Sequence, residues 1–224
     1  MKNLLLSAAL AALVAVAAVP AAHAQSVRFG LKAGGNMSNL SGDLANQDQY
    51  KNRFGFHGGA MLNVGLVGDD FLAIQVEGLY SQKGFKYTDQ QVTVLGSTYR
   101  TTGSMRYDYL DVPVLLRLKT GGLFFEAGPQ YSYLLNLNNS RTRYVNGSIT
   151  SSASYSSSNL DQIKRSELGY AAGLGFQADN GFLLGLRYNG AFTDFAQNGY
   201  SNDEFRNARH STFQAYIGVL LGGK

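Results

Sequence analysis

Hydrophobic and polar residues alternate with a period of two along most of the chain. Between Phe182 and Phe192, one parity carries large apolar side chains, whereas the other includes Gly185, Arg187 and Asn189. Because successive side chains of a β-strand point to opposite faces, this pattern predicts a strand with one apolar and one polar face. The same alternation predicts eight strands, at residues 27–35, 54–65, 71–83, 107–119, 123–135, 167–178, 182–192 and 212–221.

The predicted strands are joined by connections that alternate in length. Each strand is close to the ~9–11 residues that a tilted strand needs to cross a bilayer. The short, Gly- and Asx-rich connections lie at residues 67–70, 120–122 and 179–181. The long polar loops lie at residues 37–53, 84–106, 136–165 and 193–211. Short turns at one end and long loops at the other are typical of outer-membrane barrels. We therefore predict an all-β fold, an eight-stranded antiparallel up-and-down transmembrane β-barrel with both termini on the short-turn, periplasmic side.

The two faces of the predicted strands differ in chemistry. One face carries Leu, Val, Ile, Phe and Tyr, and the other collects the charges. Side chains only just fill an eight-stranded barrel, so the bulky face must point to lipid and the charged face to the lumen. The predicted lumen charge network contains Arg28, Lys32, Glu77, Lys83, Asp111, Arg117, Glu126, Glu167 and Arg187. We expect this network to close the barrel, although the same charges could line a narrow ion path. Its expected centre consists of Glu77, Glu126, Arg117 and Arg187.

Aromatic residues fall near both ends of the apolar face. A barrel in lipid carries two such girdles, one at each interface. The predicted girdle residues are Phe54, Tyr80, Phe125, Tyr133, Tyr170, Phe176, Phe182, Phe192 and Phe213. Phe71 has the opposite parity and would have to occupy a turn.

Residues 1–24 have the features of a secretory signal peptide, with a basic start, an apolar run and a small-x-small site at Ala22–Ala24. Residues 25–224 are then the barrel domain, and we expect it in the outer membrane of a Gram-negative bacterium. Composition agrees with a strand-rich chain, since Gly is 27, Tyr 14 and Phe 13 against only 3 Pro. The absence of cysteine excludes disulfides and thiol catalysis. A net charge of +4 without a basic run gives no indication of nucleic-acid binding.

Three motifs resemble a known family. They are Phe29–Ser38, Tyr109–Arg117 and Glu167–Gly175, of which the second is the most specific. The chain resembles the PorT-like, or porin-family, outer-membrane β-barrel proteins of Bacteroidota. The resemblance implies an eight-stranded barrel of the OmpA or OmpX type in the outer membrane, and it does not imply one activity.

Two sets of residues could suggest enzyme or cofactor chemistry. Gly173–Ala178 matches the dinucleotide pattern G-x-G-x-x-A, but it lies within a predicted strand and no helix follows, so strand packing is the better interpretation. His57 and His210 are expected to be solvated rim histidines. His210 and Ser211 are adjacent and point to opposite faces of a strand, so they cannot form a dyad. No metal-ligand spacing appears, and we expect no metal and no cofactor.

Three functions are consistent with these patterns. The leading hypothesis is a non-enzymatic outer-membrane protein that serves envelope structure or surface contacts. Its partners would be membrane lipid and envelope or extracellular proteins that meet the long loops, especially the Ser/Asn/Tyr-rich loop at 136–165. The second hypothesis is a narrow pore or an accessory component of a transport or secretion machine. The third is a rim hydrolase that acts on lipid or peptide.

Overall fold

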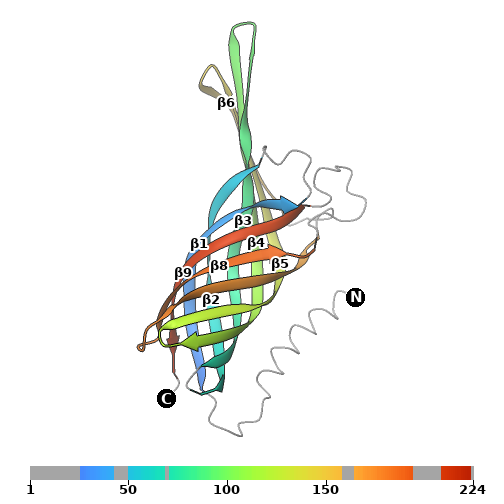
Figure 1. Cartoon of the computed structure of the whole chain (residues 1–224). Helices are drawn as coiled ribbons and strands as arrows, with labels where there is room; N and C mark the ends of the chain where they lie inside the picture. Colours follow the sequence, from blue (N-terminus) through green and yellow to red (C-terminus); the bar gives the residue numbers. More distant parts are fainter. Residues whose placement is uncertain (1–25, 43–49, 69–70, 158–163, 194–207, 223–224) are drawn as a thin grey trace.

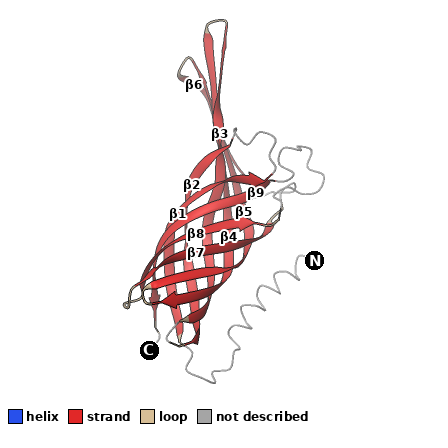
Figure 2. Ribbon diagram, viewed as in Figure 1, coloured by secondary structure: helices blue, strands red, loops and turns tan. Residues whose placement is uncertain are grey.

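The computed structural model describes residues 26–42, 50–68, 71–157, 164–193 and 208–222. Within these residues the secondary structure consists of β-strands and turns (Figure 2). The strands are β1 (Val27–Gly42), β2 (Tyr50–Val67), β3 (Leu72–Val94), β4 (Ser97–Thr120), β5 (Leu123–Val145), β6 (Ser148–Ser157), β7 (Ser166–Gln177), β8 (Phe182–Ala191) and β9 (Ala208–Leu221).

Eight of these strands form a closed antiparallel ring. The hydrogen-bonded order is β4-β3-β2-β1-β9-β8-β7-β5, and β5 pairs again with β4. The first and last strands are neighbours, with Phe29 opposite Leu221. The end of the chain marked C, which follows β9, lies at the end of the barrel that carries the short turns (Figure 1). Closure leaves no unpaired sheet edge within the ring, and it confirms the predicted eight-stranded barrel.

The short turns also match the prediction. β2 and β3, β4 and β5, and β7 and β8 are joined by tight connections at one end of the barrel. Phe71 lies in the first of these turns, where its backbone N–H donates to the carbonyl of Gly68 at 2.6 Å. The turn position explains why its parity departs from that of the strand that follows.

The prediction of long loops at 84–106 and 136–165 was wrong for most of their length. Residues 84–94 continue β3, residues 97–106 begin β4 and residues 136–145 continue β5. Residues 148–157 form β6, a strand in addition to the eight of the ring. These segments build a four-stranded extension, here called the blade, that rises from the end of the barrel opposite the short turns (Figure 1). Parts of the other two predicted loops also belong to strands, at residues 37–42, 50–53 and 208–211. Residues 43–49, 158–163 and 194–207 lie outside the described residues.

Two irregularities in strand pairing determine which side chains point inward and which point outward at the base of the blade. Leu135 is an extra residue of β5, because Leu134 pairs with Tyr109 and Asn136 pairs with Asp108. This bulge reverses the parity of β5, since one residue of slip turns every later side chain to the other face. A second shift interrupts the pairing of β2 with β3 between Asn52 and His57.

The inside and outside of the ring have opposite character. Leu186 is 60% exposed on the outer face, whereas its neighbour Arg187 is 2% exposed and points into the lumen. The same alternation of exposed apolar and buried polar residues holds along β7 and β8. Among the described residues, no helix is long and apolar enough to cross a membrane.

Candidate functional site in the barrel lumen

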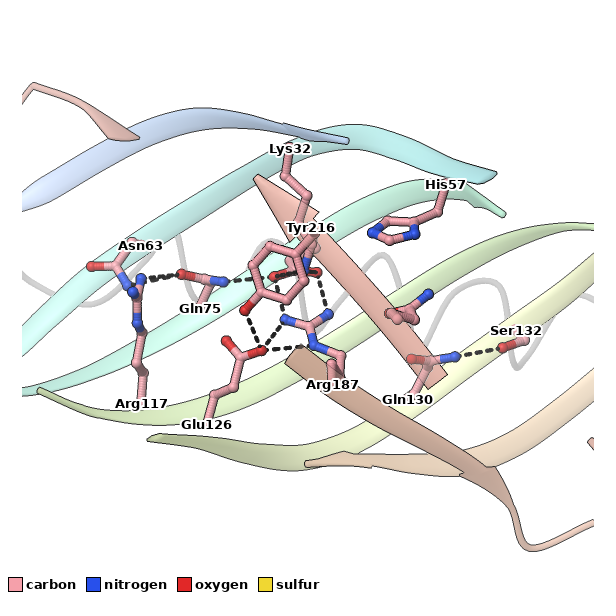
Figure 3. A network of polar contacts seen from close by, with 12 residues as sticks. Lys32, His57, Asn63, Gln75, Arg117, Glu126, Gln130, Ser132, Arg187 and Tyr216 are labelled. Atoms are coloured by element: carbon pink, nitrogen blue, oxygen red, sulfur yellow. Dashed lines mark hydrogen bonds and ion pairs between the residues drawn. The ribbon is translucent and has the colours of Figure 1, made fainter. Parts of the chain in front are cut away.

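A polar network inside the barrel includes Lys32, Arg187 and Glu126 (Figure 3). Glu77 is its centre, because Arg187, Lys32 and Gln75 all hydrogen-bond to its carboxylate. Its carboxylate accepts hydrogen bonds from Nη1 and Nη2 of Arg187 at 2.7 and 2.8 Å. Lys32 Nζ approaches the same carboxylate at 3.2 Å. The three side chains come from β3, β8 and β1, so this contact joins separate parts of the ring across the lumen.

Glu126 extends the network toward the short-turn end. Its Oε1 accepts hydrogen bonds from Arg187 Nε at 2.7 Å and from the Tyr216 hydroxyl at 2.8 Å. The ammonium group of Lys32 lies 3.6 Å from the centre of the Tyr216 ring. A cation over an aromatic face is a favourable arrangement when both groups are buried.

Arg117 joins the network through an amide rather than through a carboxylate. Its Nη1 donates to Oε1 of Gln75 at 2.9 Å, and Gln75 Nε2 donates to Glu77 at 2.6 Å. The guanidinium group also lies 3.8 Å from the centre of the Phe124 ring. Gln75 therefore connects a third cation to the Glu77 centre.

A second group of charges lies nearer the blade. Lys83 Nζ contacts Asp111 Oδ1 at 2.9 Å, Glu167 Oε1 at 3.7 Å and the Ser132 hydroxyl at 3.2 Å. His210 Nδ1 lies 2.7 Å from Glu167 Oε2. These residues form a second ion-pair network on the same lumen face.

Asn36 holds the segment between the two networks. Its Nδ2 donates to the carbonyl oxygens of Phe56 and Gln82 and to the Ser81 hydroxyl, at 3.0–3.2 Å. Its Oδ1 accepts from Gln214 Nε2 at 3.0 Å, and it lies 2.7 Å from His57 Nδ1. The amide thus links β1 to β3, β2 and β9 where β2 and β3 lose their regular pairing.

Apolar clusters lie beyond the polar networks at both ends of the lumen. The cluster near the short turns contains Met61, Phe124, Leu183, Tyr216 and Leu220. The cluster near the blade contains Leu40, Tyr50, Phe85, Tyr107, Tyr109 and Leu134. Buried charged, polar and apolar side chains thus follow one another along the described part of the lumen.

The structure buries eight of the nine charges named for the lumen in the sequence analysis. They are Lys32, Glu77, Lys83, Asp111, Arg117, Glu126, Glu167 and Arg187. Arg28 is only half-buried. Four cations face four carboxylates in this set, so the buried charge is balanced. The sequence analysis did not name three further residues of the site, Gln75, Asn36 and Tyr216. The parity of Gln75 and of Tyr216 in their strands already placed these two on the polar face.

The expectation that His57 and His210 are solvated rim residues was wrong. They are 1% and 2% exposed, respectively. His57 hydrogen-bonds to Asn36, and His210 pairs with Glu167 and packs edge-on against the rings of Tyr107 and Tyr109. Both imidazoles lie on the inward parity of their strands, which leaves them beneath the apolar cluster at the blade end rather than in solvent.

The residues named for the aromatic girdles lie on the outer face. The exposed ones are Phe54, Tyr80, Phe125, Tyr170, Phe176, Phe182, Phe192 and Phe213. Tyr133 is half-buried. On the blade side, the rings of Tyr170 and Phe192 lie 5.0 Å apart between centres. The ring of Phe213 lies 4.9 Å from that of Tyr188, which was not among the predicted girdle residues.

The last candidate from the sequence analysis is the glycine motif at Gly173–Ala178. Gly173 and Gly175 lie in β7, so the dinucleotide pattern is part of a strand as predicted. Within the residues that the structure describes, no cluster of His, Asp or Glu could hold a metal ion.

The closed ring of strands, its buried ion pairs and its exposed apolar residues define an antiparallel β-barrel with an apolar outer belt. Residues 23–197 match the family model of the outer membrane protein beta-barrel domain. The chain therefore belongs to this family of bacterial outer-membrane β-barrel proteins. No curated protein sequence matches the chain.

The chain is also similar in structure to three solved proteins. Ail, the attachment invasion locus protein of Yersinia pestis, is 16% identical with a TM-score of 0.43, over 87% of this chain and 98% of Ail. Neisserial surface protein A is 15% identical with a TM-score of 0.38, over 85% and 96%. CarO of Acinetobacter baumannii is 11% identical with a TM-score of 0.37, over 84% and 97%.

Proposed function

We propose that this protein is a non-enzymatic outer-membrane barrel with a closed lumen, which serves the envelope through contacts made by its blade. The observation that carries the proposal is the network of Lys32, Glu77, Glu126 and Arg187, whose side chains have no exposed surface. Arg187 binds two carboxylates at once, so an ion would have to displace a buried guanidinium to pass. The proposal includes export by a signal peptide at residues 1–24 and insertion among outer-membrane lipids.

The proposed contact surface is the blade. Its lumen-side face carries Arg141 and Arg143, which are both exposed, and the exposed ring of Tyr99. Tyrosine and arginine are the side chains that most often anchor protein contacts. β6 adds a strand in which serine predominates, and serine provides adaptable hydrogen bonds. This composition supports envelope or extracellular proteins as partners.

An enzymatic role is not supported by the histidines. His210 and Glu167 resemble a general base and the acid that orients it, because Nδ1 and the carboxylate are 2.7 Å apart. However, the ring is buried between two tyrosines, and a substrate could not reach it without displacing them.

Single-channel recording of the full chain, refolded and inserted in a planar bilayer, tests the closed lumen. We expect no conductance steps from inserted protein. Insertion is verified separately by the change in gel mobility between unheated and boiled samples. Discrete steps whose size changes in Glu77→Gln or Arg117→Ala would contradict the proposal.

A narrow pore or an accessory role in a transport or secretion machine, as the PorT-like resemblance suggests, is the second candidate. One observation favours it. Asn189, Thr212 and Gln214 have buried polar atoms without hydrogen-bond partners in the described residues. Unpaired groups of this kind usually contact water. The lumen is therefore not uniformly dry, and steps in the recording would support this candidate.

The contact role has its own test. In one variant, residues 91–100 at the tip of the β3–β4 hairpin are replaced by an Asn-Gly turn, which joins the paired residues Gln90 and Thr101. We expect cells that display this variant to lose attachment to surfaces or to other cells, with the barrel still folded. Unchanged attachment would contradict a role for the blade in contacts.

A further inference from the structure

Two lysines lie directly opposite each other at the base of the blade. Lys51 of β2 is the cross-strand partner of Lys86 of β3, and both side chains are exposed. Directly opposite residues have Cβ atoms about 4.5–5.5 Å apart, and like charges at such positions are destabilising. The repulsion between the two ammonium groups is therefore unfavourable, and no carboxylate in the described part of β2 or β3 forms an ion pair with either of them.

Both lysines point to the outer side of the barrel wall. On β3 the outward positions are the even ones, and Tyr80 and Lys86 belong to this set. The shift in pairing between Asn52 and His57 reverses the parity of β2. As a result Tyr50 turns inward, where its ring packs against Phe85 with 5.1 Å between centres, and Lys51 turns outward.

Neither lysine has an ion pair or hydrogen bond in the part of the chain that the structure describes. The two neighbouring cations on the same outer face are neutralised, because Arg100 pairs with Asp89 and Arg106 pairs with Asp108. On the outer face at the base of the blade, the unpaired positive charge in the described residues is therefore that of Lys51 and Lys86, whereas Arg53 lies at an inward position opposite the buried Ser38.

A polar pocket of about 310 Å³ lies beside Lys86. The side chains that line it are those of Lys86, Tyr87, Asp89, Thr102, Ser104, Ser140 and Thr142. The hydroxyl oxygens of Ser104 and Ser140 are 3.0 Å apart, so the two groups form one continuous polar surface of the pocket. Hydroxyl groups both donate and accept hydrogen bonds, which suits the hydroxyls of a sugar ring.

The position of the pocket identifies the source of its ligand. Lys51 is three residues from Phe54, and Lys86 is six residues from Tyr80, both of which are aromatic residues exposed at the blade end of the apolar belt. A strand advances about 3.3 Å per residue, so Lys51 lies about 10 Å along the strand from Phe54, and a tilt of about 45° reduces this to a height of about 7 Å, which is the depth of the lipid headgroups. Lys86 is the cross-strand partner of Lys51 and lies at the same level. They also face sideways, toward surrounding lipid, rather than over the lumen.

We propose that Lys51, Lys86 and the adjoining pocket bind the phosphorylated sugar headgroup of a glycolipid in the outer leaflet. A phosphate placed between the two ammonium groups would remove their mutual repulsion through charge-assisted hydrogen bonds. The sugar would lie against the serine and threonine hydroxyls, and the acyl chains would continue along the apolar outer face. The site lies outside the lumen, at the base of the blade, and it does not include Arg141, Arg143 or Tyr99, which were assigned to protein contacts.

Native mass spectrometry of the full chain in detergent tests the proposal, with phosphorylated lipopolysaccharide added as the probe. The same lipopolysaccharide after phosphatase treatment is the comparison ligand. We expect the phosphorylated form to be retained, and each of Lys51→Gln and Lys86→Gln to weaken retention roughly tenfold, since hydrogen bonds to charged groups are the strong ones. Lys119→Gln is the matched control, because this lysine lies beside the short turn at the opposite end of the barrel.

Three results would overturn the proposal. Equal retention by the Lys51→Gln/Lys86→Gln double variant would show that the lysines do not hold the phosphate. Equal retention of the dephosphorylated form would show that phosphate is not recognised. Equal retention of phosphatidylglycerol would show that any anionic lipid suffices and that the hydroxyl pocket does not select a sugar. Both lysines are exposed, so the substitutions leave the barrel intact, which the heat-dependent gel shift verifies.

Discussion

Arg187 donates from both of its terminal nitrogens to the carboxylate of Glu77, across a separation of 110 positions in the chain. The two residues lie on β8 and β3, which are not neighbours in the ring. The contact therefore fixes opposite walls of the barrel, and it does so where neither charge can be solvated.

Glu77→Ala is expected to destabilise the folded barrel by about 3–5 kcal/mol, because it leaves Arg187 and Lys32 buried without their counter-ion. The measurement is the free energy of unfolding by urea from lipid vesicles. Asp89→Ala is the matched control. It breaks the Arg100–Asp89 pair on the blade, whose side chains are 49% and 43% exposed, and exposed pairs contribute less than about 1 kcal/mol. Similar losses in the two variants would contradict the central role of Glu77.

The ring of strands could be predicted from the sequence because its two faces differ so sharply. An alternation such as Leu186 next to Arg187 has one physical solution in lipid, and the parity of each strand then places its charges inside. The same argument placed Glu77, Glu126 and Arg187 on one surface before any distance was known. It could not show which cation meets which carboxylate, since that depends on strand stagger.

The blade could not be predicted in the same way. Segments such as Ser148–Ser157 consist mainly of serine. Their apolar residues, Ile149, Ala153 and Tyr155, share one parity but are too few to give the strong period-two signal of the barrel strands. The bulge at Leu135 also breaks the parity that would have extended β5. The burial of His57 and His210 was missed because the apolar cluster that covers the lumen is assembled from strands far apart in sequence, including Leu40, Phe85 and Leu134.

The outward position of Leu186 leads to a second prediction. Leu186→Arg places a charge at mid-height on the outer face, and a charge near the bilayer midplane costs about 2–4 kcal/mol in a transmembrane barrel. Leu95→Arg is the control, because Leu95 is fully exposed at the tip of the β3–β4 hairpin. We expect only Leu186→Arg to lower the midpoint of urea unfolding in vesicles. Equal effects would mean that the Leu186 face does not contact lipid.

The two hairpin turns of the blade differ in one residue, which gives a third prediction. Both are two-residue turns with positive φ, at Leu95–Gly96 (49° and 77°) and at Asn146–Gly147 (50° and 83°). Asparagine occupies this region at lower cost than leucine. The Cβ of either residue crowds the following carbonyl oxygen, but the polar side chain of asparagine can hydrogen-bond to the nearby backbone. Leu95→Asn should stabilise the first tip by about 1 kcal/mol, and Asn146→Leu should destabilise the second by a similar amount. Amide hydrogen exchange at Ser97 and Ser148 measures both effects, and a change of the same sign at the two tips would contradict the argument.

The hydrogen bonds of Asn36 determine which ring nitrogen of His57 faces it as a donor. Two of the three acceptors around Asn36 Nδ2 are backbone carbonyls, so this atom must be the amide nitrogen. Its Oδ1 then accepts a hydrogen bond from His57 Nδ1–H, so a neutral ring is the Nδ1–H tautomer with a lone pair on Nε2. Nε2 is buried and has no partner in the described residues, and neither has Oε1 of Gln214.

Two buried acceptors of this kind need a donor, and water is the small donor that fits a polar site. We predict that a buried water molecule donates to His57 Nε2. Nitrogen-15 NMR of histidine-labelled protein should show the Nδ1–H tautomer for the resonance that disappears in His57→Asn, with exchange between water and this site. A ring protonated on Nε2 would contradict the prediction. It would require the Asn36 amide to be reversed, with its oxygen facing the carbonyls of Phe56 and Gln82, and that contact would be repulsive.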